Sequence, residues 1–384
     1  MREIMKELDA LSRGRVKELI QAKKDGAKII EYNGTYIPEE IIRAAGAQTY
    51  LALRGGEPEP TDAVLDYMLR FMNPLARSLA GFMQLGLDPI MPISDLLVTQ
   101  QTDNHIGRIT ELLEFKGIKV NKVGIPADWK TDGADAYYER SLREMIAEVE
   151  EITGKKVDWD EAKANFEKSN QINGWLRKIN DLRKKDNPPV GLDDVIHLHH
   201  YSFIVDPDIM LEKLETIYNK LADAEGIFEA DAPRLLFIGR AVAIGDYTVP
   251  RIFEQSGGAI VAEYFDEGYR VLQKDVETEG DLVHNFAKNR YVDTLPLSVM
   301  QPGWKERYAY FKQMIENYRI DGVVWYQLCF DEIYDMECTC LAKWLEESKV
   351  PMLKLESSYE YSRESTGPLT TRIESFVESV KEGK

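Results

Sequence analysis

The sequence predicts an α/β protein with two Rossmann- or flavodoxin-like parallel-sheet domains and a helical insertion between them. Short apolar runs alternate with helical patterns near both ends of the chain, whereas the middle shows helical periodicity only. The length of 384 residues also exceeds what one hydrophobic core ordinarily supports. We therefore expect a first α/β domain with N-terminal helices over residues 1–138, a helical linker domain over 139–230 and a second α/β domain over 231–384.

The first section alternates strand and helix patterns. Residues 27–32 (AKIIEY) are typical of a buried strand and are followed by turn residues. Residues 37–45 predict a short helix, because Pro38 lies at its start and Gly46 follows its end. A further strand, helix and strand are expected at 95–100, 106–115 and 118–125. This order favours a parallel sheet with crossover connections.

The middle section is helical, and the last section returns to the first rhythm. Helical spacing of apolar residues runs through 137–154, 161–184 and 209–224, with a break at Asn187-Pro188-Pro189. Later apolar runs predict strands at 234–238, 259–265, 322–328 and 352–355. Helices are expected between them, at 304–318 and 341–348. The similar rhythm of the two end sections suggests a pseudo-repeat.

Composition excludes several classes of function. The chain has 48 Lys and Arg against 66 Asp and Glu, a formal net charge of -18, which disfavours binding to nucleic acid. The N-terminus predicts a charged amphipathic helix without the apolar run of a signal peptide, and no stretch is long enough to span a bilayer. Three cysteines cannot form a disulfide framework, so we expect the reducing cytoplasm.

Polar side chains follow most of the predicted strands, where open α/β sheets bind their ligands. They are Asn33 to Tyr36, Gly239 and Arg240, Asp266 to Gly268, Cys329 with Asp331, and Glu356 to Tyr359. Hydroxyl, guanidinium and carboxylate groups that converge there would make a polar cleft between two α/β units. The alternative for any one of them is an ordinary surface loop.

Cys329, Cys338 and Cys340 are the candidate metal ligands. Three thiolates can hold an iron–sulfur cluster that has one open iron. A buried Cys is also a common small hydrophobic residue, and this alternative is favoured by spacing alone. Because the helix expected at 341–348 starts nearby, Cys338 and Cys340 would begin that helix and point in different directions.

His197, His199 and His200 form a second cluster, close to Asp193 and Asp194. A divalent-metal site is one interpretation, but a helix start with exposed imidazoles is favoured.

Two common motifs are absent. The Gly-Gly pairs at 55–56 and 257–258 lack the spacing of a dinucleotide or P-loop motif. No G-x-S-x-G sequence occurs, which excludes the nucleophile elbow of a serine hydrolase.

Four segments form a recognisable series along the chain. They are residues 36–42 (YIPEEII) followed by Ala44-Ala45-Gly46, residues 253–258 (FEQSGG), the strand that ends in Cys329, and residues 369–376 (LTTRIESF). Together they resemble the 2-hydroxyacyl-CoA dehydratase and benzoyl-CoA reductase family, whose PEE-hydrophobic-hydrophobic-x-AAG segment is similar to the first of them. The resemblance covers nearly the whole chain. The length of the chain is that of the family's shorter, β-type subunit.

The resemblance implies a lyase subunit in a heterodimer with an α-type dehydratase subunit, in an anaerobe that ferments amino acids. In this family an ATP-dependent iron–sulfur activator protein supplies one electron. The electron passes by a [4Fe-4S] cluster to an acyl-CoA, and the resulting ketyl radical anion of a (R)-2-hydroxyacyl-CoA expels the hydroxyl group.

The family's cluster is held by three cysteines per subunit, two early and one late. Here Asn73 and Thr102 stand at the early positions, and Cys329 stands at the late one. Either Cys338 and Cys340 build a rearranged site, or the cluster is held only by the partner subunit, and we favour the second alternative.

The resemblance and the strand ends together select four residues. We predict catalytic roles for Tyr36 and Glu39, and substrate contacts for Asp103 and Arg240. Two alternative functions remain open. One is a subunit of an aryl-CoA reductase of the benzoyl-CoA type, and the other is a cluster-free, non-catalytic assembly subunit.

Overall fold

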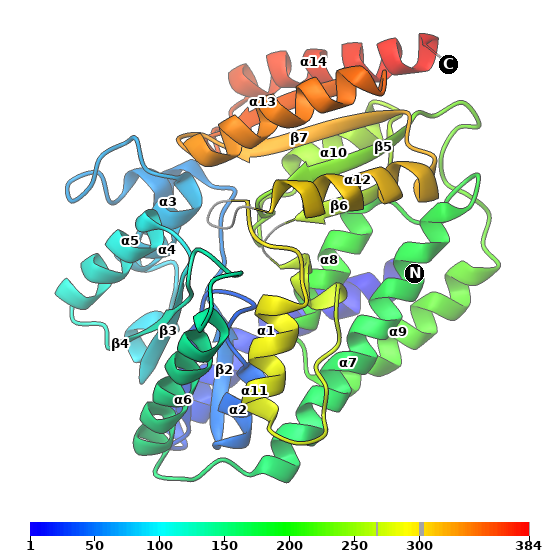
Figure 1. Cartoon of the computed structure of the whole chain (residues 1–384). Helices are drawn as coiled ribbons and strands as arrows, with labels where there is room; N and C mark the ends of the chain where they lie inside the picture. Colours follow the sequence, from blue (N-terminus) through cyan, green and yellow to red (C-terminus); the bar gives the residue numbers. More distant parts are fainter. Residues whose placement is uncertain (266–267, 299–302, 384) are drawn as a thin grey trace.

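The computed structural model describes residues 1–265, 268–298 and 303–383, and it contains two parallel four-stranded sheets (Figure 1). The first sheet has the order β2-β1-β3-β4 and the second the order β6-β5-β7-β8. Their strands are β1 (Lys28–Tyr32), β2 (Ala47–Leu51), β3 (Leu96–Gln101), β4 (Val120–Gly124), β5 (Arg234–Gly239), β6 (Ala259–Phe265), β7 (Gly322–Leu328) and β8 (Met352–Ser357). Counted along each section, the strand order is the same in both sheets. The predicted fold class is confirmed.

Helices cover both faces of the first sheet. One face packs, with Ile30, Leu96 and Val98, against α2 (Glu39–Ala44), α6 (Ala134–Thr153) and α7 (Trp159–Asp181). The other face packs, with Leu97, against α4 (Pro74–Gln84) and α5 (Asn104–Phe115), next to the short α3 (Pro58–Asp62). Both faces are buried, which explains why the inner strands are almost continuously apolar.

The second sheet is enclosed in the same way. Helices α12 (Trp304–Tyr318) and α13 (Glu332–Glu347) cover one face. Helices α8 (Leu192–Ser202), α10 (Thr248–Gln255) and α14 (Arg363–Glu382) cover the other, and α14 forms the top edge of the molecule in Figure 1.

A separate helical core lies beside the two sheets. Apolar side chains of α1 (Arg2–Lys24), α7, α8 and α9 (Pro207–Ala222) form it. None of the helices in the described ranges is both long enough and apolar enough to cross a membrane.

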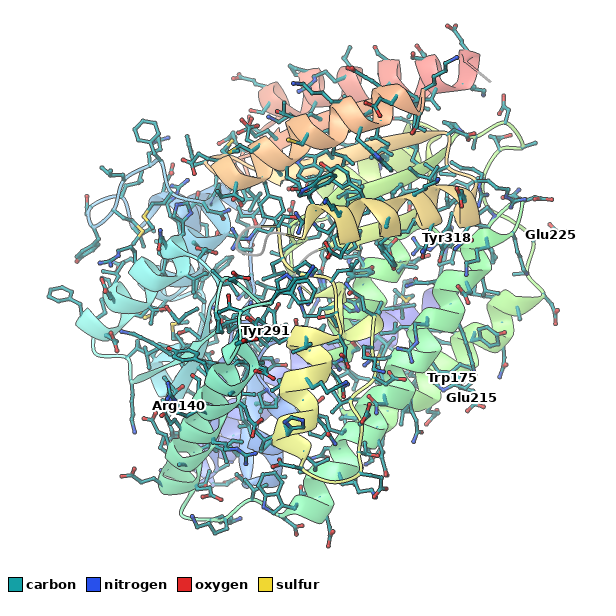
Figure 2. The ribbon with its side chains drawn as sticks, viewed as in Figure 1. Arg140, Trp175, Glu215, Glu225, Tyr291 and Tyr318 are labelled. Carbon is teal, nitrogen blue, oxygen red and sulfur yellow. The ribbon has the colours of Figure 1, made fainter. Side chains whose placement is uncertain are left out.

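The two end sections of the chain are interleaved. Residues 276–297 come from the later section, but their apolar side chains pack in the core of the first sheet. They include α11 (Leu282–Ala287) and a turn of π-helix over Lys288–Val292. Tyr291 of that turn lies in the interior (Figure 2), where its ring is 5.4 Å from the ring of Tyr138 on α6. In the opposite direction, Leu75 of α4 joins the core of the second sheet.

Several elements of the structure were not predicted, among them α4, α10 and α14, and two further differences have a clear physical reason. Strand β2 was not predicted, because this edge strand buries only alternate residues and carries Gln48 and Thr49. Helix α13 begins at Glu332 rather than 341. Its buried face includes Tyr334 and Cys338, so Cys338 is a buried small hydrophobic residue, the alternative that the cysteine spacing alone favours.

Candidate functional site

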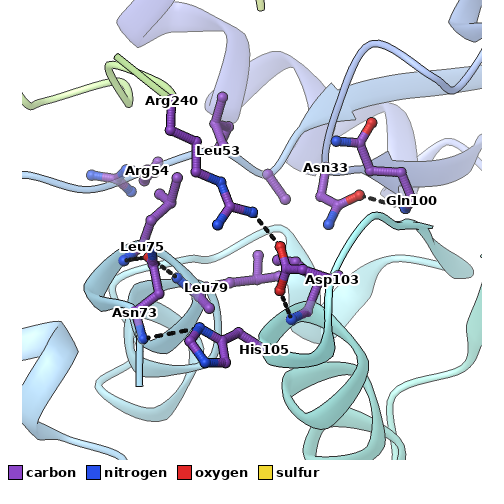
Figure 3. A pocket seen from close by; sticks show the side chains of 13 residues that line it. Asn33, Leu53, Arg54, Asn73, Leu75, Leu79, Gln100, Asp103, His105 and Arg240 are labelled. Carbon is purple, nitrogen blue, oxygen red and sulfur yellow. Dashed lines mark hydrogen bonds and ion pairs between the residues drawn. The ribbon is translucent and has the colours of Figure 1, made fainter. Parts of the chain in front are cut away.

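The candidate site lies where the strand order of both sheets reverses. In each sheet the second strand along the chain lies on one side of the first strand, and the third strand lies on the other side. The strand order therefore reverses between β1 and β3 in the first sheet and between β5 and β7 in the second sheet. Asn33 follows β1, and its Oδ1 accepts a hydrogen bond from the backbone N–H of Gln100 on β3 at 2.8 Å (Figure 3). The loops after β5 and β7 face this point and supply Arg240 and Asp331.

A buried polar network connects the two reversal points. The Arg240 guanidinium forms an ion pair with Asp103, and its Nη1 lies 3.0 Å from Oδ2 of Asp331. The same Asp331 oxygen accepts a hydrogen bond from the Asn73 amide at 2.9 Å. The side chains of Arg240, Asp103 and Asp331 are only 7%, 11% and 5% exposed. The network therefore spans the two sheets almost out of contact with water.

Two members of the network are held by helix ends. Asp103 is the N-cap residue of α5 and accepts a hydrogen bond from the N–H of Ile106 at 3.0 Å. Asn73 is the N-cap residue of α4, and its Oδ1 accepts from the N–H of Leu75 at 2.9 Å and more distantly from Ala76. Because a capping side chain is fixed by the helix that it caps, α4 and α5 determine where these groups point.

The charges of the network favour an ionised Asp103. Burial alone would raise the pKa of this carboxyl group. The Arg240 guanidinium and the Ile106 N–H outweigh that effect and hold the pKa of Asp103 below its ordinary value.

The network closes a small pocket. Its volume is about 20 Å³, room for roughly one water molecule. The lining combines apolar side chains with polar ones, as Figure 3 shows: Leu53, Leu75 and Leu79, and Asn33, Asn73, Gln100, Asp103, His105 and Arg240. A bound ligand of ordinary size would need the pocket to open.

The structure therefore brings Asp103 and Arg240 together, as their predicted role in one cleft requires. Asp266 and Glu267, which were expected at the same edge, lie outside the described residues. Asp331 lies at the edge where polar side chains were expected after the strands, and Asn73 was identified only as the residue at an early cysteine position. His105, which also lines the pocket, was not predicted. Asn73-Pro74 is an N-cap signal that could have revealed the start of α4, since Pro is favoured at the first helical position.

Tyr36 lies in the core of the first section rather than in this pocket. Its side chain is 1% exposed, and the Arg270 guanidinium lies 4.7 Å from its ring. The Tyr138 hydroxyl donates a hydrogen bond to the Tyr36 carbonyl oxygen. The predicted catalytic role of Tyr36 gains no support from this position.

Glu39 lines a different surface groove, of about 540 Å³, beside Arg43. It accepts a hydrogen bond from the Thr49 hydroxyl at 2.9 Å. Its predicted catalytic role also stays a prediction without support from the geometry.

The three cysteines lie in three different environments. Cys329 is half-buried directly after β7, where burial and the neighbouring Glu356 raise the pKa of its thiol to about 11. Cys338 and Cys340 lie within α13 rather than at its start, and one is buried while the other is exposed. Two residues along a helix correspond to about 200° of rotation, so these two thiols point to opposite sides.

The donor atoms of this chain do not fit a cluster held by three thiolates. Both polar side-chain atoms of Asn73 are already hydrogen-bonded, and Thr102 is a buried hydroxyl. Only Cys329 offers sulfur at the three positions that the family resemblance indicates, and iron–sulfur clusters prefer thiolates. Over the described ranges, no three side chains of His, Cys, Asp or Glu are grouped as metal ligands.

The histidine cluster differs from its favoured interpretation. His199 and His200 are buried in α8, not exposed, because this helix packs between the second sheet and the helical core. His200 is held between the Tyr247 hydroxyl at 2.7 Å and the Val242 carbonyl at 3.0 Å. Burial lowers the pKa of His199 to about 4 and that of His200 to about 3, so both are neutral near pH 7.

The first Gly-Gly pair lies where two backbone segments come close together. Residues Gly55 and Gly56 follow β2, and Gly245 lies in the loop after β5 with a φ of +107°. A Cβ atom on Gly245 would lie 2.5 Å from the Gly55 carbonyl oxygen. Beside this contact, Arg54 and Ile244 form a parallel β-bridge, a second connection between the two sections.

Comparisons with known proteins agree with the resemblance. The family model described as 2-hydroxyglutaryl-CoA dehydratase, D-component, matches residues 34–380. The protein named "Putative dehydratase subunit YjiM" of Escherichia coli strain K12 is 24% identical over 365 residues, which cover 94% of this chain and 93% of that protein.

Two further relatives are similar over the same extent. A subunit of the benzoyl-CoA reductase of Thauera aromatica is 22% identical over 92% of this chain and 91% of its own length. The (R)-phenyllactyl-CoA dehydratase beta subunit of Clostridium sporogenes is 22% identical over 93% of both chains.

Proposed function

Because the chain belongs to the 2-hydroxyglutaryl-CoA dehydratase D-component family, we propose that it is a subunit of a 2-hydroxyacyl-CoA dehydratase. The enzyme would eliminate water from a (R)-2-hydroxyacyl-CoA. The observation that carries this proposal within the fold is the polar network of Arg240, Asp103 and Asp331 at the facing reversal points of the two sheets. Ligands of open α/β sheets bind at such points.

In the proposed reaction, one electron reduces the thioester carbonyl to a ketyl radical anion, which expels hydroxide. Deprotonation and return of the electron then leave the enoyl-CoA. We assign Arg240 and Asp103 to substrate binding, because they line the pocket and are fixed there by their mutual ion pair. A guanidinium that is held before the substrate arrives can stabilise negative charge without reorganisation.

The proposal includes two protein partners. An α-type dehydratase subunit would hold the [4Fe-4S] cluster, and an ATP-dependent iron–sulfur activator protein would supply the electron, both in the cytoplasm of an anaerobe. The names of all three relatives describe them as subunits, which supports a partner for this chain. The donor set described above supports a cluster on the partner rather than here.

An exposed apolar patch beside the pocket is our candidate surface for the α-type subunit. It consists of Leu69, Phe71, Ile333 and Met336, whose exposed fractions are 72%, 68%, 45% and 68%. The ring of Phe71 contacts that of Phe330 at 5.4 Å and so joins the segment before α4 to the start of α13. Figure 1 shows the α3 region next to the beginning of α13. Exposed apolar side chains of this size on two segments that meet favour a protein contact.

The proposal is tested with the complex of this chain, its α-type subunit and the activator, under anaerobic conditions with ATP. A (R)-2-hydroxyacyl-CoA should be converted to the enoyl-CoA, as followed by mass spectrometry of the CoA esters. The variant Arg240→Lys should lower kcat/KM by at least about tenfold, because an ammonium group cannot bind both carboxylates in the same geometry. An assembled and reduced complex that never releases water from such esters would contradict the proposal.

An aryl-CoA reductase subunit is the second candidate, favoured by the similarity to the benzoyl-CoA reductase of Thauera aromatica. The same complex given an aryl-CoA would then form a ring-reduced ester and leave 2-hydroxyacyl-CoA unchanged. A non-catalytic assembly subunit is the third candidate, suggested by Asn73 and Thr102 at the two early positions. In that case Arg240→Lys would leave turnover unchanged while the complex still required the chain.

A further inference from the structure

The space at the facing strand ends is filled by polar side chains from four separate segments. Asn73 and Asp103 belong to the first section and begin α4 and α5. Arg240 follows β5 and Asp331 follows β7 in the second section. The ion pair of Arg240 with Asp103 connects the two sections, and so does the hydrogen bond of Asn73 with Asp331.

We infer that this network of Asn73, Asp103, Arg240 and Asp331 ties the two sections together in place of a metal cluster. Cysteines at the two early positions and at the late position would attach a cluster to both sections, so losing it would remove a connection. In this chain the side chain of Asn73, at the first early position, instead donates a hydrogen bond to Asp331. The inference rests on these contacts and not on the proposed dehydratase activity.

The hydrogen bonds of the network are arranged so that neither carboxylate depends on Arg240 alone. Asp103 also accepts from the N–H of Ile106, and Asp331 also accepts from the amide of Asn73. Buried charges are tolerated when ion pairing and further hydrogen bonds replace the lost water. Removing Arg240 would leave two buried carboxylates near each other without their shared cation, and separating the two sections would relieve this.

A second connection between the sections makes the test specific. The backbone bridge between Arg54 and Ile244 involves none of the four side chains of the network, so it should remain when the network is removed. Loss of the network should therefore loosen the two sections without unfolding either sheet, so that a folded variant can be measured.

The test uses the full chain and a double-mutant cycle. Arg240→Met should lower Tm by about 5 °C or more, and Asp103→Asn, which keeps a capping side chain on α5, by less. The combined variant should lose clearly less than the sum of the two, because the two groups interact. Arg108→Met is the matched control, since Arg108 pairs with Glu111 on the surface with 70% and 52% exposure, and it should shift Tm by no more than about 1 °C.

Two results would overturn the inference. One is additive losses in the cycle, which would show that Arg240 and Asp103 do not stabilise each other across the two sections. The other is a rise in the Tm of the wild-type chain by about 5 °C or more on anaerobic addition of ferrous iron and sulfide. Neither measurement depends on dehydratase activity. Failure of the proposed function would therefore leave this inference unchanged, and failure of this inference would leave the proposed function unchanged.

Discussion

Asp246 lies fully buried near the second reversal point and accepts hydrogen bonds from two tyrosine hydroxyls. The Tyr326 hydroxyl lies 2.6 Å from one carboxylate oxygen, and the Tyr361 hydroxyl lies 2.8 Å from the other. Burial raises the pKa of Asp246 to about 6, although both hydroxyls act in the opposite direction. The folded protein therefore keeps this proton at pH values where the unfolded chain has lost it.

We predict that this carboxyl group makes the fold less stable as the pH rises from about 4 to about 6. In that window the unfolded state has already released the proton and the folded state has not, so raising the pH favours unfolding. The effect is on the order of 3 kcal/mol, from about 1.4 kcal/mol per pKa unit. Urea unfolding of wild type and Asp246→Asn across this range measures it. Parallel curves for the two proteins would contradict the assignment.

Cys338 and Cys340 allow a second test at the scale of single residues, because they lie in the same helix and differ in burial. Cys338 is 3% exposed in the core between α13 and the second sheet, whereas Cys340 is exposed. Cys338→Ser should cost about 1–3 kcal/mol in the free energy of unfolding, because it buries a hydroxyl in an apolar site. Cys340→Ser should change it by less than about 0.5 kcal/mol. Equal losses for both would mean that α13 is oriented differently.

At the scale of single elements, helix α4 matters because it carries Asn73. Its position depends on close packing against α3, where Gly81 faces the Pro60 carbonyl. A Cβ atom at Gly81 would lie 1.7 Å from that oxygen. By contrast, a Cβ at Gly174 on α7 would meet only the end of the Arg177 side chain, at 3.9 Å.

We predict opposite effects of the same substitution at these two helical glycines. Gly81→Ala should destabilise the protein by about 2–3 kcal/mol, since one backbone must move away from the other. Gly174→Ala should stabilise it by about 0.5–1 kcal/mol, because Ala restricts the unfolded chain and fits the helix. Thermal unfolding of both variants checks this, and a neutral Gly81→Ala would show that α3 and α4 are not in close contact.

Elements with a strong local pattern could be predicted from the sequence. Strands β6 and β7 and helix α12 have the predicted bounds, because each is a buried apolar run or a sustained helical pattern. Strand β2 and the first two turns of α13 could not be predicted in this way. Their burial is decided by neighbouring strands and by the sheet on which they pack, rather than by local sequence.

At the scale of the whole molecule, the site also contains some residues that could be predicted from the sequence and others that could not. Asp103 and Arg240 could be selected because parallel strands bring their carboxyl ends to one edge. The hydrogen bond between Asn73 and Asp331 joins residues 258 positions apart, and no local pattern encodes it. Likewise, nothing in residues 276–297 themselves indicates that they complete the core of the first sheet.

The apolar patch beside the pocket leads to a prediction about assembly. Phe71→Ser combined with Met336→Ser should weaken binding of the α-type subunit by at least about tenfold, since both side chains are largely exposed and apolar. Ile227→Ser is the control, because Ile227 is 57% exposed in the connection after α9 and is not part of the patch. Pull-down and titration with the purified partner measure the effect. Unchanged binding by a folded double variant would place the contact elsewhere.

We propose that this chain contributes a closed polar network and that its partner subunit contributes the cluster. The most direct test is the iron and acid-labile sulfide content of the chain purified alone under anaerobic conditions, before and after reconstitution. The donor set of Asn73, Thr102 and Cys329 predicts far less than one iron per chain in both cases. About four iron and four sulfide per chain, lost in Cys329→Ser, would contradict it.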